Sequence, residues 1–145
     1  MPNKLTKILD NFYHDMAIAD LKLRNSNLEN SKLTYNSMLY LNIISAHSGK
    51  YTASNIADML NITRPSVTQK LNELEKMEYI IKKQCELDKR IYYIYINEKM
   101  LPKEFTKKYE KIEQEISKRF SDNYSEEEIN RFYDMLSLLG SVYLE

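Results

Sequence analysis

Apolar residues recur every three or four positions along most of this chain, and that spacing is typical of helices that bury one face. Residues 4–24 predict one such amphipathic helix. Residues 34–47 are almost entirely apolar, as expected of a helix surrounded by others. Residues 52–60 predict a short helix with Thr52 as its N-cap. The first part of the chain is therefore predicted to be helical.

The second half of the chain predicts two longer amphipathic helices, over residues 100–121 and 125–144. Asn97 is interpreted as the cap of the first of them. Ser125 opens the second, and Glu128 three residues later completes a capping box. Apolar residues at helical spacing form the buried face expected on the first of these helices: Phe105, Tyr109, Ile112, Ile116 and Phe120.

The stretch NITRPSVTQKLNELEKM, residues 61–77, has apolar spacing on one side only. Val67, Leu71 and Leu74 form the stripe that is expected to pack against the preceding helix and Ile62. Thr63 is placed to cap the helix, and Pro65 falls in the first turn, where its missing N–H is not needed. The packing of this helix does not account for the polar and basic residues on its opposite side.

Two short runs rich in Ile and Tyr follow, at residues 79–84 and 90–97, and the segment 85–89 separates them. Residues of these types at this spacing predict a two-stranded antiparallel hairpin. The order of a helix, a three-residue connection, a second helix and a hairpin is that of a winged helix-turn-helix. The predicted fold class is therefore mainly α with a small two-stranded β wing.

In such a fold, the polar side of the second helix faces the major groove of duplex DNA. Arg binds guanine with two hydrogen bonds and Gln binds adenine similarly, while Ser and Thr hydroxyls suit phosphate oxygens. The residues predicted to contact DNA from this helix are Thr63, Arg64, Pro65, Ser66, Thr68, Gln69 and Lys70.

Composition narrows the class of protein. The 145 residues include only two Gly and three Pro, which leaves little turn material for an all-β design. One cysteine excludes an internal disulfide, and no apolar run suggests secretion or membrane spanning, so we expect a cytoplasmic protein. The two histidines and the absence of catalytic motifs argue against a metal site, a cofactor and an enzyme. The net charge of zero hides a modest basic excess in residues 62–96.

The stretches LTYNSMLYLNII, ASNIADMLNITRPSVTQKLNELEKMEYI and ELDKRIYYIYINEKM resemble the MarR-type transcriptional regulators, over about residues 33–100. The most specific feature is the Asp-x-Arg of the wing, Asp88-Lys89-Arg90. The resemblance implies a wing whose tip approaches the minor groove, and Lys83, Asp88, Lys89 and Arg90 are the wing residues assigned to DNA binding. The chain departs from the family at Glu78 and Asn61, where glycine is frequent in the family.

The same resemblance implies a single domain over residues 1–145, with a winged helix-turn-helix at 33–99 and helical dimerisation regions at 4–24 and 100–145. It also implies a homodimer that binds a pseudo-palindromic operator in double-stranded DNA as a repressor and responds to a small-molecule effector of unknown identity.

Several alternatives stay open. In one alternative, the role of the wing lysines is to keep an exposed strand edge from pairing with another strand. The near-neutral charge also allows a winged module that binds another protein and not DNA. Cys85 precedes the wing turn beside Gln84 and Glu86, a setting that does not favour a reactive thiolate, so a redox role is not expected.

Overall fold

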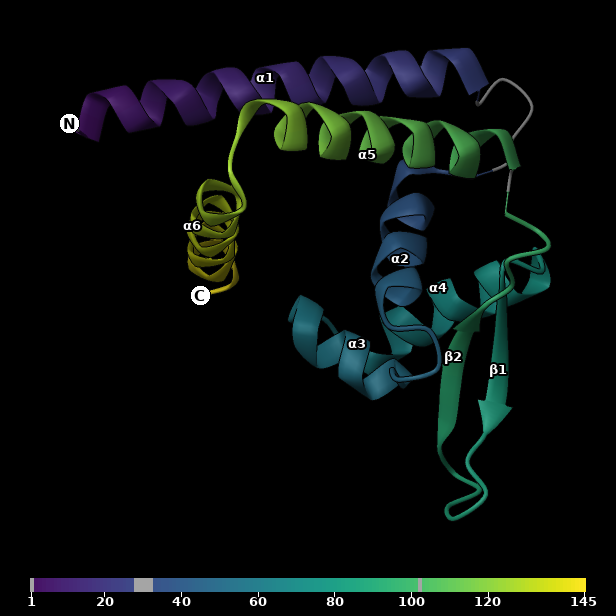
Figure 1. Cartoon of the computed structure of the whole chain (residues 1–145). Coiled ribbons are helices and arrows are strands. Elements are labelled where there is room, and N and C mark those ends of the chain that lie inside the picture. The colour runs from purple at the N-terminus through teal and green to yellow at the C-terminus, as the bar shows by residue number, and fades with distance from the viewer. Residues whose placement is uncertain (1, 28–32, 102) are drawn as a thin grey trace. The chain divides into compact units, whose positions relative to one another are not determined.

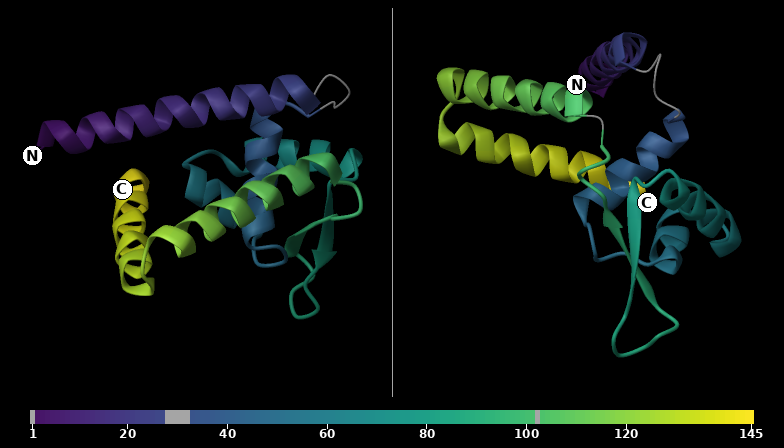
Figure 2. Two further views of the ribbon diagram at one scale, coloured as in Figure 1. Left: turned by 45° about the horizontal axis from the view of Figure 1, so that its top comes forward. Right: turned by 90° about the vertical axis from the view of Figure 1, so that its right-hand side faces the viewer.

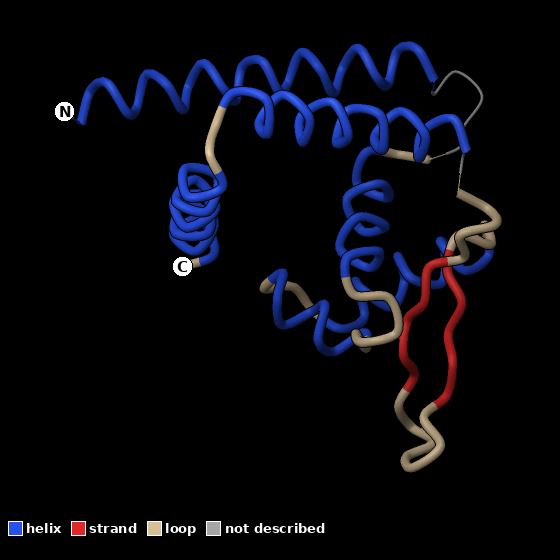
Figure 3. Tube along the Cα trace, in the orientation of Figure 1, coloured by secondary structure: helices blue, strands red, loops and turns tan. Residues whose placement is uncertain are grey.

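The computed structural model describes residues 2–27, 33–101 and 103–145, and the chain divides into two compact units, residues 1–101 and 102–145. Figure 1 shows the elements, and Figure 3 shows the helices in blue and the strands in red. In chain order they are α1 (Pro2–Asn27), α2 (Tyr35–Ala46), α3 (Ala53–Leu60), α4 (Arg64–Lys76), β1 (Ile80–Gln84), β2 (Tyr92–Ile96), α5 (Lys103–Asn123) and α6 (Glu126–Leu144).

Hydroxyl side chains start the helices as the sequence predicts. The Thr52 hydroxyl accepts a hydrogen bond from the Asn55 N–H at 3.2 Å, and the Asn55 side chain accepts one from the Thr52 N–H at 2.9 Å. Thr63 caps α4, and Ser125 with Glu128 forms the predicted capping box of α6. Since these contacts are local, the sequence alone sets where α3, α4 and α6 begin.

The core of the winged module lies where α2, α3, α4 and the hairpin meet. Val67, Leu71 and Leu74 of α4 are at most 1% exposed, which confirms the predicted stripe. The other members of this core are Tyr40, Leu41, Ile44, Ile56, Ala57, Ile80 and Ile94. Ile62 does not join it and is 41% exposed, so the prediction that it packs there is wrong. The tight turn points its side chain outward.

Two residues with positive φ set the direction of the chain around α4. Asn61 ends α3 in the left-handed conformation, with φ 51° and ψ 41°. Glu78 follows α4 with φ 63°. At both positions the sequence departs from the glycine that is frequent in the resembled family. Asn tolerates this conformation better than other side chains, whereas Glu has no such advantage.

The wing is an antiparallel hairpin in which Ile80 pairs with Ile96 and Gln84 pairs with Tyr92, as predicted. A third segment, not predicted from the sequence, lies along the other edge of β2. There the Ile94 N–H donates to the Tyr51 carbonyl at 2.9 Å, and the Gly49 N–H donates to the Ile94 carbonyl at 2.7 Å. Gly49 has φ 80°, a conformation that glycine adopts without strain.

Two predicted boundaries are wrong. The helix predicted to begin near residue 100 begins at Lys103, and Asn97 does not cap it. Asn97 instead joins the two ends of the hairpin, because its N–H donates to the Tyr79 carbonyl and its side-chain amide donates to the Glu78 carbonyl at 2.8 Å. At the other end of the chain, α1 continues to Asn27, past the predicted end at residue 24.

The terminal helices keep large apolar side chains on their surfaces. In α5 and α6, Phe120 contacts Phe132 edge to face across the turn between the helices, with ring centroids 5.4 Å apart. On α5, Ile112 and Ile116 remain 45% and 49% exposed. Phe105, predicted on the same face, has a side chain outside the described residues. Helix α1 exposes Leu5, Ile8, Phe12, Met16 and Leu21.

We predict that Glu78→Gly stabilises the protein. The left-handed conformation costs a residue with a Cβ about 1–2 kcal/mol, and glycine loses about 0.5–1 kcal/mol more backbone entropy on folding. The free energy of unfolding should therefore rise by about 0.5–1 kcal/mol, measured by urea denaturation at fixed protein concentration. Glu78→Ala is the control, because it removes the same side chain but keeps the Cβ. Equal stabilisation by both variants would attribute the effect to the lost charge.

Candidate nucleic-acid interface

The outward face of α4 carries the residues that the sequence assigns to DNA. Because Val67, Leu71 and Leu74 point into the core, the opposite side of the helix is open to solvent. A shallow surface hollow on this side is lined by Arg64, Pro65, Thr68, Gln69 and Asn72. Helical geometry thus brings these five exposed side chains onto one face, and all except that of Pro65 can form hydrogen bonds.

The first turn of α4 is held by its own cap. The Thr63 hydroxyl lies 2.8 Å from the Ser66 hydroxyl and accepts the Ser66 N–H at 3.4 Å. Pro65 contributes no N–H. The start of the helix therefore presents fewer free backbone donors to an anion than an uncapped helix does, and the side chains carry more of the binding capacity.

Lys70 departs from the expected direction and lies on the inner side of α4. Its ammonium Nζ is 2.8 Å from Glu73 Oε2 and 3.4 Å from the hydroxyl of Ser37 on α2. Ser37 is only 1% exposed and also accepts a hydrogen bond from Thr34 at 2.9 Å. Lys70 is 20% exposed. It therefore ties α4 to the start of α2 and is not aligned with Arg64 and Gln69.

A second lysine ties the opposite side of α4 to the wing. Lys82 of β1 donates to Asn72 and forms an ion pair with Glu75 at 2.8 Å. Like Lys70 it is mostly covered, at 19% exposure. The recognition helix α4 is thus fixed by contacts from α2 on one side and from β1 on the other.

The Asp88–Arg90 pair organises the tip of the wing. Arg90 Nε donates to Asp88 Oδ1 and Arg90 Nη2 donates to Asp88 Oδ2, both at 3.1 Å, and the Arg90 N–H donates to Asp88 Oδ1 at 3.0 Å. These contacts hold the pKa of the Asp88 carboxyl below its usual value and raise the pKa of Arg90. The turn is closed further by a hydrogen bond from the Gln84 amide to the Lys89 carbonyl at 2.6 Å.

The remaining wing residues have different settings. Lys83 Nζ lies 4.5 Å from the centre of the Tyr95 ring, a cation–π contact along the hairpin. Lys89 is exposed beside Arg90. Cys85 has a free thiol and is half-buried. Its backbone N–H donates to the Ile91 carbonyl at 2.8 Å and so closes the base of the wing turn.

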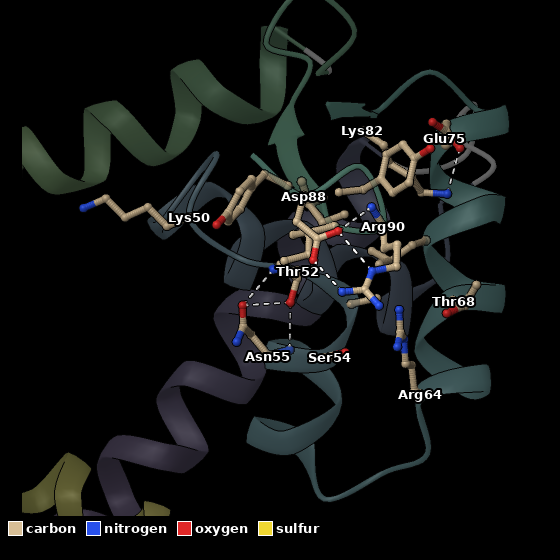
Figure 4. Close-up of a pocket in the computed structure, with 16 residues that line it drawn as sticks. Lys50, Thr52, Ser54, Asn55, Arg64, Thr68, Glu75, Lys82, Asp88 and Arg90 are labelled. Carbon is tan, nitrogen blue, oxygen red and sulfur yellow. Dashed lines mark hydrogen bonds and ion pairs between the residues drawn. The ribbon is translucent and has the colours of Figure 1, made fainter. Parts of the chain in front are cut away.

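An open groove runs between α4 and the wing (Figure 4). Arg64 and Thr68 of α4 line it together with Asp88 and Arg90 of the wing. The turn before α3 and the start of α3 also contribute residues that the sequence did not assign to the site: Lys50, Thr52, Ser54 and Asn55. In the sequence, the N-cap at Thr52 is the feature that marks this segment.

Within the described parts of the chain, no three His, Cys, Asp or Glu side chains come close enough together to hold a metal ion.

None of the helices that the structure describes is long and apolar enough to cross a membrane.

We predict that Asp88 titrates below the ordinary value for an aspartate, about 3.9. Because its folded pKa is lowered, the pair contributes stability above the unfolded pKa and loses it as pH falls through the folded pKa. An NMR titration of the Asp88 carboxyl measures this. In Arg90→Ala the pKa should return toward the ordinary value. Identical titration in both proteins would show that the pair does not form in solution.

Comparison with known proteins agrees with this geometry. Residues 33–92 match the model of the MarR family. No curated protein sequence matches the chain. Among solved structures, the chain is similar to Streptococcus pneumoniae FabT in complex with DNA, at 22% identity over 99% of this chain and 97% of that chain, with a TM-score of 0.68.

Two structures of MepR from S. aureus show the same likeness in fold. A mutant from a multidrug-resistant clinical isolate is 20% identical, over 95% of this chain and 96% of that chain, with a TM-score of 0.69. The MepR–DNA complex is 21% identical, over 92% and 96%, with a TM-score of 0.52. Residues 33–92 of this chain therefore match the MarR family model, and the chain has the same fold as these solved structures.

Proposed function

We propose that this protein is a sequence-specific DNA-binding transcriptional regulator. The observation that carries the proposal is the exposed polar face of α4, which continues through one groove to the Asp88–Arg90 wing. The match of residues 33–92 to the MarR family supports it. So does the likeness in fold to FabT and MepR, each of which has been solved in complex with DNA.

In this proposal α4 enters the major groove and the wing lies beside it. Arg64 and Gln69 contact base edges, while Ser66 and Thr68 contact phosphates or bases. Thr63 and Pro65 shape the helix start. Lys83, Lys89 and Arg90 contact the backbone or minor groove from the wing. Asp88 holds Arg90 in position. It does not contact a phosphate itself, because both groups are negatively charged.

Lys70 has a different role in the proposal from the one expected from the sequence. Its contacts with Ser37 and Glu73 turn its charge away from the outward face of α4. We assign it to positioning α4. Lys82, with its contacts to Asn72 and Glu75, does the same from the wing.

A homodimer is the assembly that best explains the terminal helices. Residues 4–24 and 100–145 would supply the dimerisation region of a single domain formed by residues 1–145, with 33–99 as the DNA-binding part. The apolar side chains that are exposed on these helices in the single chain support it: Leu5, Ile8, Phe12, Ile112, Ile116, Phe132 and Leu136. Burial in a twin chain removes them from water, and a two-fold axis matches a pseudo-palindromic operator.

Three further parts of the proposal rest on the resemblance to the family. They are action in the cytoplasm as a repressor, response to a small-molecule effector, and the absence of enzymatic activity. The second candidate function is a winged module that binds another protein. The pairing of Lys70, Lys82 and Arg90 with carboxylates favours it, because these pairs reduce the basic charge free for DNA.

Enrichment of random duplex DNA on the purified full-length protein, at low and moderate salt, tests the proposal. We expect a two-fold symmetric site with half-site centres about 10 base pairs apart, a spacing of roughly 34 Å, and binding that weakens steeply with salt. Recovery of no duplex at either salt would reject DNA binding by the free protein and favour the protein-partner alternative.

We predict that Arg64→Ala and Lys70→Met separate the two roles. Arg64→Ala should leave thermal unfolding unchanged and weaken operator binding by about 1–3 kcal/mol per half-site. Lys70→Met keeps the stem of the side chain and should leave the slope of log K against log salt unchanged. A phosphate contact would instead flatten that slope by about 0.9 per contact. A flatter salt slope in Lys70→Met would show that Lys70 contacts a DNA phosphate.

A further inference from the structure

The tip of the wing presents one large apolar side chain to solvent. Leu87 is 99% exposed, the highest value among the large apolar residues that the structure describes. Single exposed apolar residues are common on protein surfaces. Leu87 differs from most of them because it lies at the end of a projecting arm and the turn around it is firmly held.

Three sets of contacts fix this turn. Asp88, the next residue, is held by three hydrogen bonds from Arg90. The Ile91 N–H donates to the Asp88 carbonyl at 3.0 Å, and the Cys85 N–H donates to the Ile91 carbonyl at 2.8 Å. Leu87 is therefore displayed on a backbone that is already ordered, so binding through it costs little additional conformational entropy.

The position of the tip relative to α4 indicates what it meets. The groove shared by Arg64, Thr68, Asp88 and Arg90 makes the outward face of α4 and the wing one continuous surface. Figure 2 shows the hairpin as an arm that projects beyond the helices of the winged module. Leu87 lies three residues beyond Gln84, the last paired residue of β1, so the chain places it at most ~10 Å from that residue. With α4 in a major groove about 12 Å wide, an arm at its side reaches the adjacent minor groove.

We propose that Leu87 packs into the DNA minor groove and is a specificity-determining residue of the proposed regulator. Proteins that bind the minor groove frequently insert apolar side chains, leucine among them, between its base steps. The neighbouring Lys89 and Arg90 supply the charge that holds the backbone. The side chain favours a groove floor without the guanine 2-amino group, so it selects A·T over G·C at the base pairs under the tip. This inference rests on the proposed function.

The test uses the full-length protein and the operator recovered by enrichment. The base pairs under the tip are made A·T, G·C or inosine·C. Inosine lacks the 2-amino group, so the last pair keeps the major groove of G·C but has the minor-groove pattern of A·T. The wild type should bind the inosine·C and A·T operators alike and the G·C operator more weakly. That result separates the tip from the major-groove contacts of α4.

Four variants identify the residue responsible. Leu87→Ala should weaken binding to the A·T operator about tenfold or more per half-site, lose most of the preference for inosine·C over G·C, and leave the salt slope unchanged. Leu87→Met should behave like the wild type. Glu86→Ala, a change at the neighbouring exposed residue, should keep the preference, and Lys89→Ala should flatten the salt slope by about 0.9 per contact.

Wild-type binding with no difference between inosine·C and G·C would overturn the inference while leaving the proposed function intact. So would an undiminished preference in Leu87→Ala. Failure of the wild type to bind any duplex would instead reject the proposed function, and the role of Leu87 with it. Because Leu87 is fully exposed, unchanged thermal unfolding of Leu87→Ala checks that the fold is preserved.

Discussion

The apolar stripe of α4 is the constraint on which the rest of the winged module depends. Val67, Leu71 and Leu74 are removed from water between α2, α3 and the hairpin, and burying each contributes about 1.5–3 kcal/mol. Once these three side chains point inward, helical geometry leaves Arg64 and Gln69 no direction except outward. The packing of the core therefore also determines which side chains form the candidate DNA-binding face.

Charge is distributed by the same packing. Lys70 of α4 and Lys82 of β1 are mostly covered and paired with Glu73 and Glu75. Through Ser37 and Asn72 they also fix the helix between α2 and β1. Arg90 is paired with Asp88 but remains 90% exposed, so it can both stiffen the wing and meet a ligand. Because a summed charge hides its distribution, a neutral net charge is compatible with DNA binding through exposed basic groups such as Lys89 and Arg90.

The terminal helices present the apolar surface through which two chains would associate. Their apolar side chains have the spacing of a buried face, yet many stay exposed in the single chain, among them Phe12 on α1 and Phe132 on α6. Surface of this kind favours association. A dimer built on these helices would also set the separation of two α4 helices, and with it the spacing of half-sites that the protein reads.

Local features of this fold followed from the sequence, because short-range contacts decide them. The caps at Thr52, Thr63 and Ser125 and the wing hairpin need only neighbouring residues. The tertiary structure alone decided the inward direction of Lys70, the use of Asn97 to join the ends of the hairpin and the segment paired with β2. It also brought the start of α3 to the groove. Each of these depends on a partner distant in the chain, such as Ser37 for Lys70. Periodicity shows on which side of a helix a long side chain begins, but packing between elements determines where its charged end lies.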